Sequence, residues 1–385
     1  MNTVFITGGT GLLGRAVVRR LLQGDESVAV KLLVRASSEE MLQARIERLL
    51  QYLGINFRDP GVRARVEGIR GDITLPRMGL SDTQYRELAL GVKGILHIAA
   101  CTKWGLPLED LKEVNVSGTE RVAEFARTAA QEGGLKFFAH VSTAYVAGDR
   151  TGVIREAELW EGQQFNNNYE RSKFEGEMLV QNIKEDVPTV VLRPSMIIGD
   201  SQTGETPNFN VFYYIVKLSV KGRLPALPTR GSAFVDLIPS DYAAAALYEI
   251  VNQTTSIGKT FHLCSGPDRT PTMDEILGLM RTYFSQHSAQ NGENRHRPPM
   301  MLNPTMYKYF VAPLLKATLP AKQRERMTNV ELYIPYTTSR KIFDISNTIA
   351  ATDELGAALP LLQEYYSNIF QFCLDTDWKG KGPVV

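Results

Sequence analysis

The sequence predicts an α/β protein built on a parallel, doubly wound sheet, to which a smaller, mostly helical region is added. Two observations carry this prediction. Short apolar runs alternate with stretches of helical periodicity as far as about residue 200, a pattern typical of repeated strand–helix–strand units. The first of these runs, Val4–Ile6, ends in a cluster of glycines, which is how phosphate-binding turns begin in such sheets.

Length, composition and charge narrow the class further. The 385 residues exceed one minimal domain, and 43% hydrophobic with 22% charged residues is ordinary for a globular protein. A net charge of +1 gives no reason to expect a nucleic-acid partner. Cys101, Cys264 and Cys373 lack metal-ligand spacing, so we expect free thiols and no metal site. Without a signal peptide or an apolar run of about 20 residues, we expect a cytoplasmic protein with at most peripheral membrane contact; its oligomeric state is left open.

The chain divides where the strand–helix alternation stops, just beyond Gly199. We expect a Rossmann-type dinucleotide-binding domain over residues 1–200, completed by about 233–265. The substrate-binding and C-terminal region then comprises residues 201–232 and 266–385.

The glycine cluster follows the first strand and precedes a helix that begins at about Leu12. Its glycines fit two frames, G-x-G-x-x-G through Gly9, Gly11 and Gly14, or T-G-x-x-G-x-x-G through Gly8, Gly11 and Gly14. Glycine permits a tight turn and a close approach of the backbone to a phosphate, and the helix start offers free N–H groups and a positive dipole end. The stretch therefore predicts a dinucleotide site.

The next apolar run, 28–34, predicts a second strand that ends at Arg35. Folds that prefer NAD usually carry an acidic side chain here, which holds the ribose 2′-hydroxyl. A guanidinium followed by Ser37 and Ser38 suits a 2′-phosphate instead, and Arg45 on the following helix is placed to add a second guanidinium. The residues therefore favour NADP(H), unless Arg35 is simply a solvated surface residue.

Two further apolar runs predict the third and fourth strands, at residues 66–73 and 94–100. Asp72, at the end of the third, is suited either to accept a hydrogen bond from an adenine amine or to cap the turn that follows. The fourth ends in the small residues Ala99–Ala100, which let a cofactor lie against the backbone. His97, inside the fourth run, fits a hydrogen-bonded core histidine better than a ligand or a base.

Residues 111–130 are expected to form a helix that carries Asn115, and 137–143 and 188–194 the fifth and sixth strands. The fifth strand delivers hydroxyls at its end, among them that of Thr143. Because parallel strands present their carboxyl ends at one edge of a sheet, the groups that follow them meet in one crevice.

The stretch 166–173 supplies the second functional signal. Its asparagines are good N-caps for a helix that starts near Tyr169, and Tyr169 and Lys173 lie one turn apart on one helix face. A phenol has an ordinary pKa of about 10, and a nearby ammonium lowers that pKa towards the working range of a general acid. Because the pair follows a glycine loop and a hydroxyl-ended strand, we interpret it as catalytic rather than as two surface residues.

In this order, the motifs resemble the extended short-chain dehydrogenases/reductases, and more narrowly the branch of fatty acyl-CoA (male-sterility) reductases and thioester reductases. The resemblance covers about residues 1–270 well and the rest poorly. It is carried by Thr7–Gly14, Leu33–Arg35, Gly71–Asp72, His97–Ala100, Asn115–Thr119, His140–Tyr145, Tyr169-x-x-x-Lys173 and Leu192–Ser195, with weaker echoes in Val235–Pro239 and Phe343–Asn347.

The resemblance implies a catalytic triad of Thr143, Tyr169 and Lys173, with Asn115 ordering a proton relay. It implies NADPH-dependent reduction of an acyl thioester, carried by coenzyme A or a carrier protein, to the aldehyde, or to the alcohol if a second hydride follows. Tyr169 would act as the acid, Lys173 would tune it and Thr143 would hold the oxyanion. Asn115 is equally suited to a helix-terminal hydrogen bond. The apolar, aromatic segment 209–227 would form the acyl pocket or pack in the core.

The expected cofactor contacts come from the glycine loop, the strand ends and the catalytic helix. They are Thr7, Gly8, Gly9, Thr10, Gly11, Leu12, Leu13, Gly14, Arg35, Arg45, Asp72, Ile73, Ala99, Ala100, Tyr169, Lys173, Pro194 and Ser195, and the expected cofactor is NADP(H).

Two other functions stay open. One is another extended short-chain dehydrogenase, such as a hydroxysteroid dehydrogenase/isomerase or a sugar epimerase, although an epimerase that retains NAD would more naturally carry an acidic residue at position 35. The other is a non-enzymatic NADP-sensing protein, which typically lacks the tyrosine or the lysine. Two stretches also keep two interpretations: Lys103 as a substrate contact or a loop residue, and 307–315 as a membrane or partner contact or, the favoured interpretation, part of the core.

Overall fold

The computed structural model describes residues 2–224, 226–290, 299–318, 320, 324, 331–352 and 359–379. Its centre is a seven-stranded sheet in the order β11-β7-β5-β4-β1-β2-β3, in which every neighbouring pair is parallel. The predicted parallel, doubly wound sheet is confirmed. Its strands are β1 Asn2–Thr7, β2 Val28–Val34, β3 Val66–Arg70, β4 Gly94–His97, β5 Phe137–Val141, β7 Thr189–Pro194 and β11 Thr260–Leu263.

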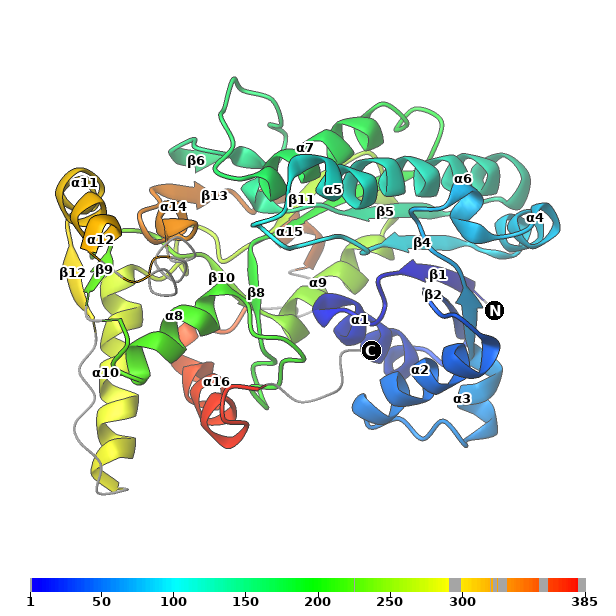
Figure 1. Ribbon diagram of the computed structural model, residues 1–385. Coiled ribbons are helices and arrows are strands. Elements are labelled where there is room, and N and C mark those ends of the chain that lie inside the picture. Colours follow the sequence, from blue (N-terminus) through cyan, green and yellow to red (C-terminus); the bar gives the residue numbers. More distant parts are fainter. Residues whose placement is uncertain are drawn as a thin grey trace.

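Helices cover both faces of this sheet (Figure 1). Two apolar clusters bury the two faces, one against α1, α2 and α9 and the other against α4, α6 and α7. Both faces are covered because each crossover between parallel strands must return over the sheet. The helices are α1 Leu12–Gly24, α2 Glu39–Tyr52, α4 Asp82–Gly91, α6 Gly118–Gly133, α7 Asn168–Gln181 and α9 Ser240–Val251.

The strand order reverses direction between β1 and β4. From β1 the chain runs outward to β2 and β3, then returns to pair β4 with β1 on the other side. In an open α/β sheet this switch point opens a crevice at the carboxyl ends of the strands. The glycine loop after β1 and the residues after β4 therefore share one crevice.

A second, smaller region contains most of the remaining helices and is joined to the sheet by short strand pairs (Figure 1). Its own apolar cluster includes Tyr145 and Ile154 from the sheet half, so the predicted boundary at residue 200 does not separate two independent cores. Its elements include β6 Gly152–Ile154 paired with β13 Lys341–Phe343, β8 Met196–Ile198 with β10 Leu237–Pro239, β9 Ala226–Pro228 with β12 Met300–Leu302, and helices α8 Val211–Val220, α10 Met273–Gln290, α14 Ile334–Thr337, α15 Ser346–Thr352 and α16 Leu362–Asp375.

The segment 307–315 corrects the expectation of core burial. It comprises a π-helical turn, Tyr307–Val311, and the start of α12, Ala312–Thr318. Tyr307 and Ala312 are buried, whereas Phe310 is 71% exposed and its neighbours Tyr309 and Leu314 are exposed as well. One face of the segment therefore packs and the other faces solvent. No helix of the described ranges is both long and apolar enough to cross a bilayer.

Candidate active site

The glycine loop adopts one of the two predicted frames. Gly8 has φ of +76°, and a Cβ added there would lie 2.5 Å from the backbone nitrogen of Ala99. A Cβ on Gly14 would lie 2.1 Å from the Gly8 carbonyl oxygen, whereas one on Gly9 would meet only the flexible side chain of Leu32. The spacing Gly8, Gly11, Gly14 is therefore the one that the backbone requires.

The loop is suited to a dinucleotide phosphate. Gly11 is the N-cap of α1, and no side chain caps the helix there, so the N–H groups of the first turn remain available to an anion. A Cβ on Gly11 would approach only the Gly8 carbonyl, at 3.4 Å. Arg15, which the sequence did not single out, holds the loop in place because its Nε donates to the Thr10 carbonyl at 2.8 Å.

Three guanidinium groups gather where the second strand ends. Arg45 on α2 donates to the backbone carbonyl of Arg35. Burial lowers the pKa of Arg45, and the positive charges of Arg35 and Arg48 lower it further. This cluster fits a dianionic ribose phosphate better than a ribose hydroxyl, because each nearby cation is otherwise repelled by the others.

Asp72, Pro194 and Ser195 each have local partners. The strand β3 ends at Arg70, and Asp72 Oδ1 accepts hydrogen bonds at 2.9 Å from both the N–H and the hydroxyl of Thr74, which is the capping geometry. Ser195 Oγ donates to Asp236 Oδ1 at 2.6 Å. The Pro194 carbonyl accepts from a threonine hydroxyl, described next. The adenine role of Asp72 and the cofactor roles of Pro194 and Ser195 stay predictions.

The structure brings Thr143, Tyr169 and Lys173 together at the carboxyl end of β5. Asn167 is the N-cap of α7, and the first turn of that helix carries Tyr169. The hydroxyl of Thr143 is hydrogen-bonded to the Tyr169 phenol and donates to the Pro194 carbonyl at 3.3 Å. One turn further along α7, Lys173 donates from Nζ to the Val141 carbonyl at 2.9 Å and is 2% exposed.

The protonation states of the pair differ from the expectation. The sequence predicted that Lys173 lowers the pKa of Tyr169, but burial raises the pKa of Tyr169 to about 12, with the Thr143 hydrogen bond acting in the opposite direction. The Lys173 ammonium is directed at the Val141 carbonyl instead. Burial lowers the pKa of Lys173 itself to about 8, against the Glu177 carboxylate. At neutral pH both groups therefore carry their proton, as a proton donor and its cationic neighbour should.

Asn115 lies in a π-helical turn, Glu113–Ser117, between α5 Leu108–Lys112 and α6. Its side chain is fully buried and makes two bonds to the backbone of Cys101, at 2.8 and 3.0 Å, and one to the Ser172 hydroxyl at 2.9 Å. The amide thus joins the loop after β4 to the catalytic helix. Such single π turns are frequent at functional sites. The proton-relay role of Asn115 stays a prediction.

Two buried histidines lie beneath the site. His97 bridges the hydroxyls of Thr7 and Thr119, at 2.7 and 3.0 Å, as expected of a hydrogen-bonded core histidine. Burial lowers the pKa of His97 to about 3, and Lys173 adds to that effect. The ring of His140 lies 5.3 Å from that of His97, and burial holds its pKa well below the usual value. Both rings are therefore neutral beside the lysine.

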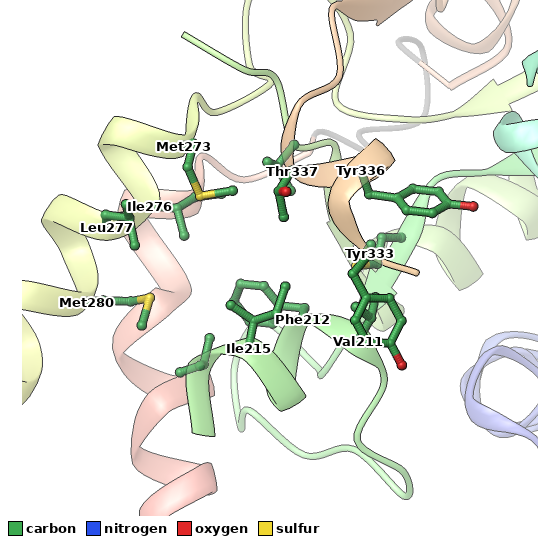
Figure 2. Close-up of a pocket in the computed structure, with 13 residues that line it drawn as sticks. Val211, Phe212, Ile215, Met273, Ile276, Leu277, Met280, Tyr333, Tyr336 and Thr337 are labelled. Atoms are coloured by element: carbon green, nitrogen blue, oxygen red, sulfur yellow. The ribbon is translucent and has the colours of Figure 1, made fainter. Parts of the chain in front are cut away.

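An apolar pocket of about 460 Å³ adjoins these residues. Figure 2 shows Phe212 and Ile215 of α8 facing Met273, Ile276 and other side chains of α10 across it, with α14 closing a third side. The segment 209–227 thus contributes α8, as the sequence suggested, but α10 and α14 were not anticipated. Besides the tyrosines, the one polar lining side chain is Thr337.

Aromatic side chains connect this pocket to the catalytic tyrosine, and the sequence gave no sign of them. Tyr336 lines the pocket and lies 4.4 Å from Trp104, ring centroid to ring centroid, and Trp104 in turn stacks near Tyr169 at 6.4 Å. Lys103, beside Trp104, is exposed, so both interpretations of it stay open. The three cysteines are free thiols, and no group of three metal-ligating side chains occurs among the described residues.

Comparison with known proteins adds the family. Residues 6–247, more than half of the chain, match a model of NAD-binding domains described as Male sterility protein. The chain belongs to this family. Membership accounts for the glycine loop and supports a nicotinamide dinucleotide as cofactor, and the match ends where the second, smaller region begins to dominate the chain.

Relatives of this family member fall into two groups. "Probable fatty acyl-CoA reductase 5" of Arabidopsis thaliana is 24% identical over 90% of this chain and 88% of its own. "Nonribosomal peptide synthetase asaC" of Aspergillus flavus is 30% identical over 92% of this chain but only 34% of its own. The chain therefore spans about a third of that relative's length, and less of the gramicidin synthase subunit of Brevibacillus parabrevis, at 6%.

Solved structures share the fold of this family member. The terminal R domain from the myxalamid pathway superposes with a TM-score of 0.79 at 23% identity, covering 98% of this chain and 91% of that one. A UDP-glucuronic acid 4-epimerase from Bacillus cereus, in complex with NAD, gives 0.62 at 17% identity over 96% and 99% of the two chains. At these identities the likeness establishes the fold alone.

Proposed function

We propose that the protein is an NADPH-dependent reductase of acyl thioesters. The observation that carries this proposal is the convergence of Thr143, Tyr169 and Lys173 between a glycine loop suited to a dinucleotide and an apolar pocket suited to an acyl chain. The names of the relatives, fatty acyl-CoA reductases and peptide synthetases, support the same reaction class. Coenzyme A and a carrier protein are both candidate thioester carriers.

When bound, the reduced dinucleotide supplies the hydride that reaches the thioester carbonyl carbon. Thr143 and Tyr169 lie where two hydroxyls donate to the oxyanion that develops on the carbonyl oxygen. Tyr169, whose pKa is raised to about 12, is protonated at neutral pH and gives its proton to that oxygen. The hemithioacetal then expels the thiol to leave an aldehyde, and a second round gives the alcohol.

The experiment is NADPH oxidation with a series of acyl-CoAs of increasing chain length, followed by loss of the nicotinamide absorbance. Thioester-dependent oxidation that is lost in Tyr169→Phe is the expected result, and the hydride consumed per thioester distinguishes aldehyde from alcohol. Silence with every acyl-CoA and acyl-carrier thioester, beside retained dinucleotide binding, would refute the proposal. Hydroxysteroids and nucleotide sugars tested in the same assay address the other short-chain dehydrogenase functions.

The choice of NADPH over NADH rests on Arg35, with Arg45 and Arg48 beside it. Replacing Arg35 by Asp removes one charge-assisted hydrogen bond to the 2′-phosphate, worth about 1.5–3 kcal/mol, and should lower kcat/KM for NADPH about 10- to 100-fold with little loss for NADH. Arg63→Asp is the matched control, an exposed arginine on α3 Pro60–Arg65. Equal losses for both cofactors in Arg35→Asp would contradict the assignment.

A further inference from the structure

We propose that Tyr336 couples the acyl pocket to the catalytic helix, so that a long acyl chain in the pocket positions Tyr169 for proton transfer. Resting on the proposed reductase function, this makes Tyr336 a positioning and specificity-determining residue. It lies 167 positions beyond Tyr169 in the sequence, in the short helix α14, and is 5% exposed.

The first step of the argument is that Tyr336 has two ends in two different sites. Its ring lines the apolar pocket, and in Figure 2 its hydroxyl points away from α10 and out of the pocket. That hydroxyl donates to Glu170 Oε1 and accepts from Asn167 Nδ2 at 2.7 Å. Asn167 is the N-cap of α7 and Glu170 lies in its first turn, so these two partners flank Tyr169.

The second step is that Glu170 cannot release this bond without cost. Its side chain is fully buried, and its other hydrogen bonds come from the backbone and side chain of Asn166. Lys341, 6% exposed and five residues beyond Tyr336, adds a positive charge near the same carboxylate. A buried acceptor that loses its donor is destabilised by about 1–3 kcal/mol, so a displacement of Tyr336 is transmitted to α7.

The third step is that the rings make a continuous stack from the pocket to the reacting hydroxyls. Trp104 lies 4.4 Å from Tyr336 and stacks on Tyr169 with an interplanar angle of 16°. On its other side Tyr336 meets Tyr145 edge-on at 5.0 Å, two residues after Thr143. A chain that packs against Tyr336 therefore acts on the surroundings of both hydroxyls that hold the oxyanion.

The consequence concerns kcat rather than binding. Energy gained by a remote part of the substrate raises kcat when it is used to orient the reacting groups. We therefore expect kcat of the protein to rise with acyl chain length until the chain reaches Tyr336, and KM to fall through apolar contact with α8 and α10.

The variants Tyr336→Phe and Glu170→Gln break the same bond from its two ends. Each should lower kcat for long-chain acyl-CoAs about tenfold, leave kcat for short chains and KM within about threefold, and the double variant should lose no more than either single one. Tyr333→Phe is the matched control, since Tyr333 lines the same pocket and contacts Trp104 at 5.4 Å. Equal losses at every chain length, or losses that add in the double variant, would overturn the proposal.

Hydrogen exchange tests the coupling without turnover. Binding of palmitoyl-CoA to the full chain should increase protection of the amides at 168–173 in the wild type and in Tyr333→Phe, but not in Tyr336→Phe. Unchanged protection in the wild type would overturn the coupling. Increased protection in a protein that oxidises no NADPH with any thioester would refute the reductase function while the coupling stands.

Discussion

At the scale of single residues, the site depends on one buried cation. Burial lowers the pKa of Lys173 to about 8, so the charged form predominates below pH 8 and is lost as the pH rises through that value. Since kcat/KM reports the free enzyme, we expect it to be level near pH 7 and to fall tenfold per unit above about pH 8. The Tyr169 phenol, with a pKa of about 12, adds no loss in this range.

A pH profile of kcat/KM for NADPH-dependent thioester reduction measures this. In Lys173→Arg the alkaline fall should move above pH 10, because a guanidinium keeps its charge there. A wild-type profile that stays level to pH 10 would show that the charge on Lys173 is not required.

At the scale of elements, the glycine loop separates stability from binding. Gly8→Ala forces a Cβ to within 2.5 Å of the Ala99 backbone at a positive φ, so it should destabilise the fold by about 1–3 kcal/mol. Gly11 has φ of −76° and only the Gly8 carbonyl at 3.4 Å, so Gly11→Ala should change stability little yet weaken dinucleotide binding by filling the approach to α1. Urea unfolding and NADPH titration of both variants measure the two effects. Equal destabilisation would contradict the distinction.

The elements that could be predicted are those written in local sequence. Strands such as β2 and the start of α7 at its Asn167 cap follow from apolar runs and capping residues. The pairing of β6 with β13 and the bond from Tyr336 to Glu170 join segments more than 160 residues apart, and no periodicity reports such contacts. The π turn at Asn115 was missed for a related reason: it is one extra residue inside an otherwise helical pattern.

At the scale of the whole molecule, buried polar groups tie the sheet to the C-terminal region. Arg193 of β7, 1% exposed, forms a salt bridge with Glu177 of α7 at 2.6 Å and donates to the Glu158 carbonyl. Glu156 accepts from the N–H groups of His262 and Asn347, at 2.8 and 2.6 Å, and so joins β11 to the start of α15. The acyl pocket thereby keeps a fixed position relative to the catalytic helix.

The same burial makes the fold sensitive to acid. His97 and His262 are fully buried, and burial lowers the pKa of each to about 3, whereas the unfolded chain titrates near 6.5. Between these values the unfolded chain binds more protons, so the contribution of each histidine is complete above pH 6.5 and is lost as the pH falls, by up to about 1.4 kcal/mol per unit. Glu156 and Asp236, whose pKa values burial raises, act in the opposite direction at lower pH.

A single substitution isolates one histidine from these opposing groups. His97→Gln removes the titrating ring but retains groups able to bond Thr7 and Thr119, so its destabilisation should be largest at pH 7.5. Below pH 6.5 the difference from wild type should shrink by about 1.4 kcal/mol per unit, because the wild type alone bears the cost of keeping His97 neutral. Urea unfolding at pH 7.5, 6.0 and 5.0 measures this difference, and a value independent of pH would show that His97 titrates alike in the folded and unfolded chains.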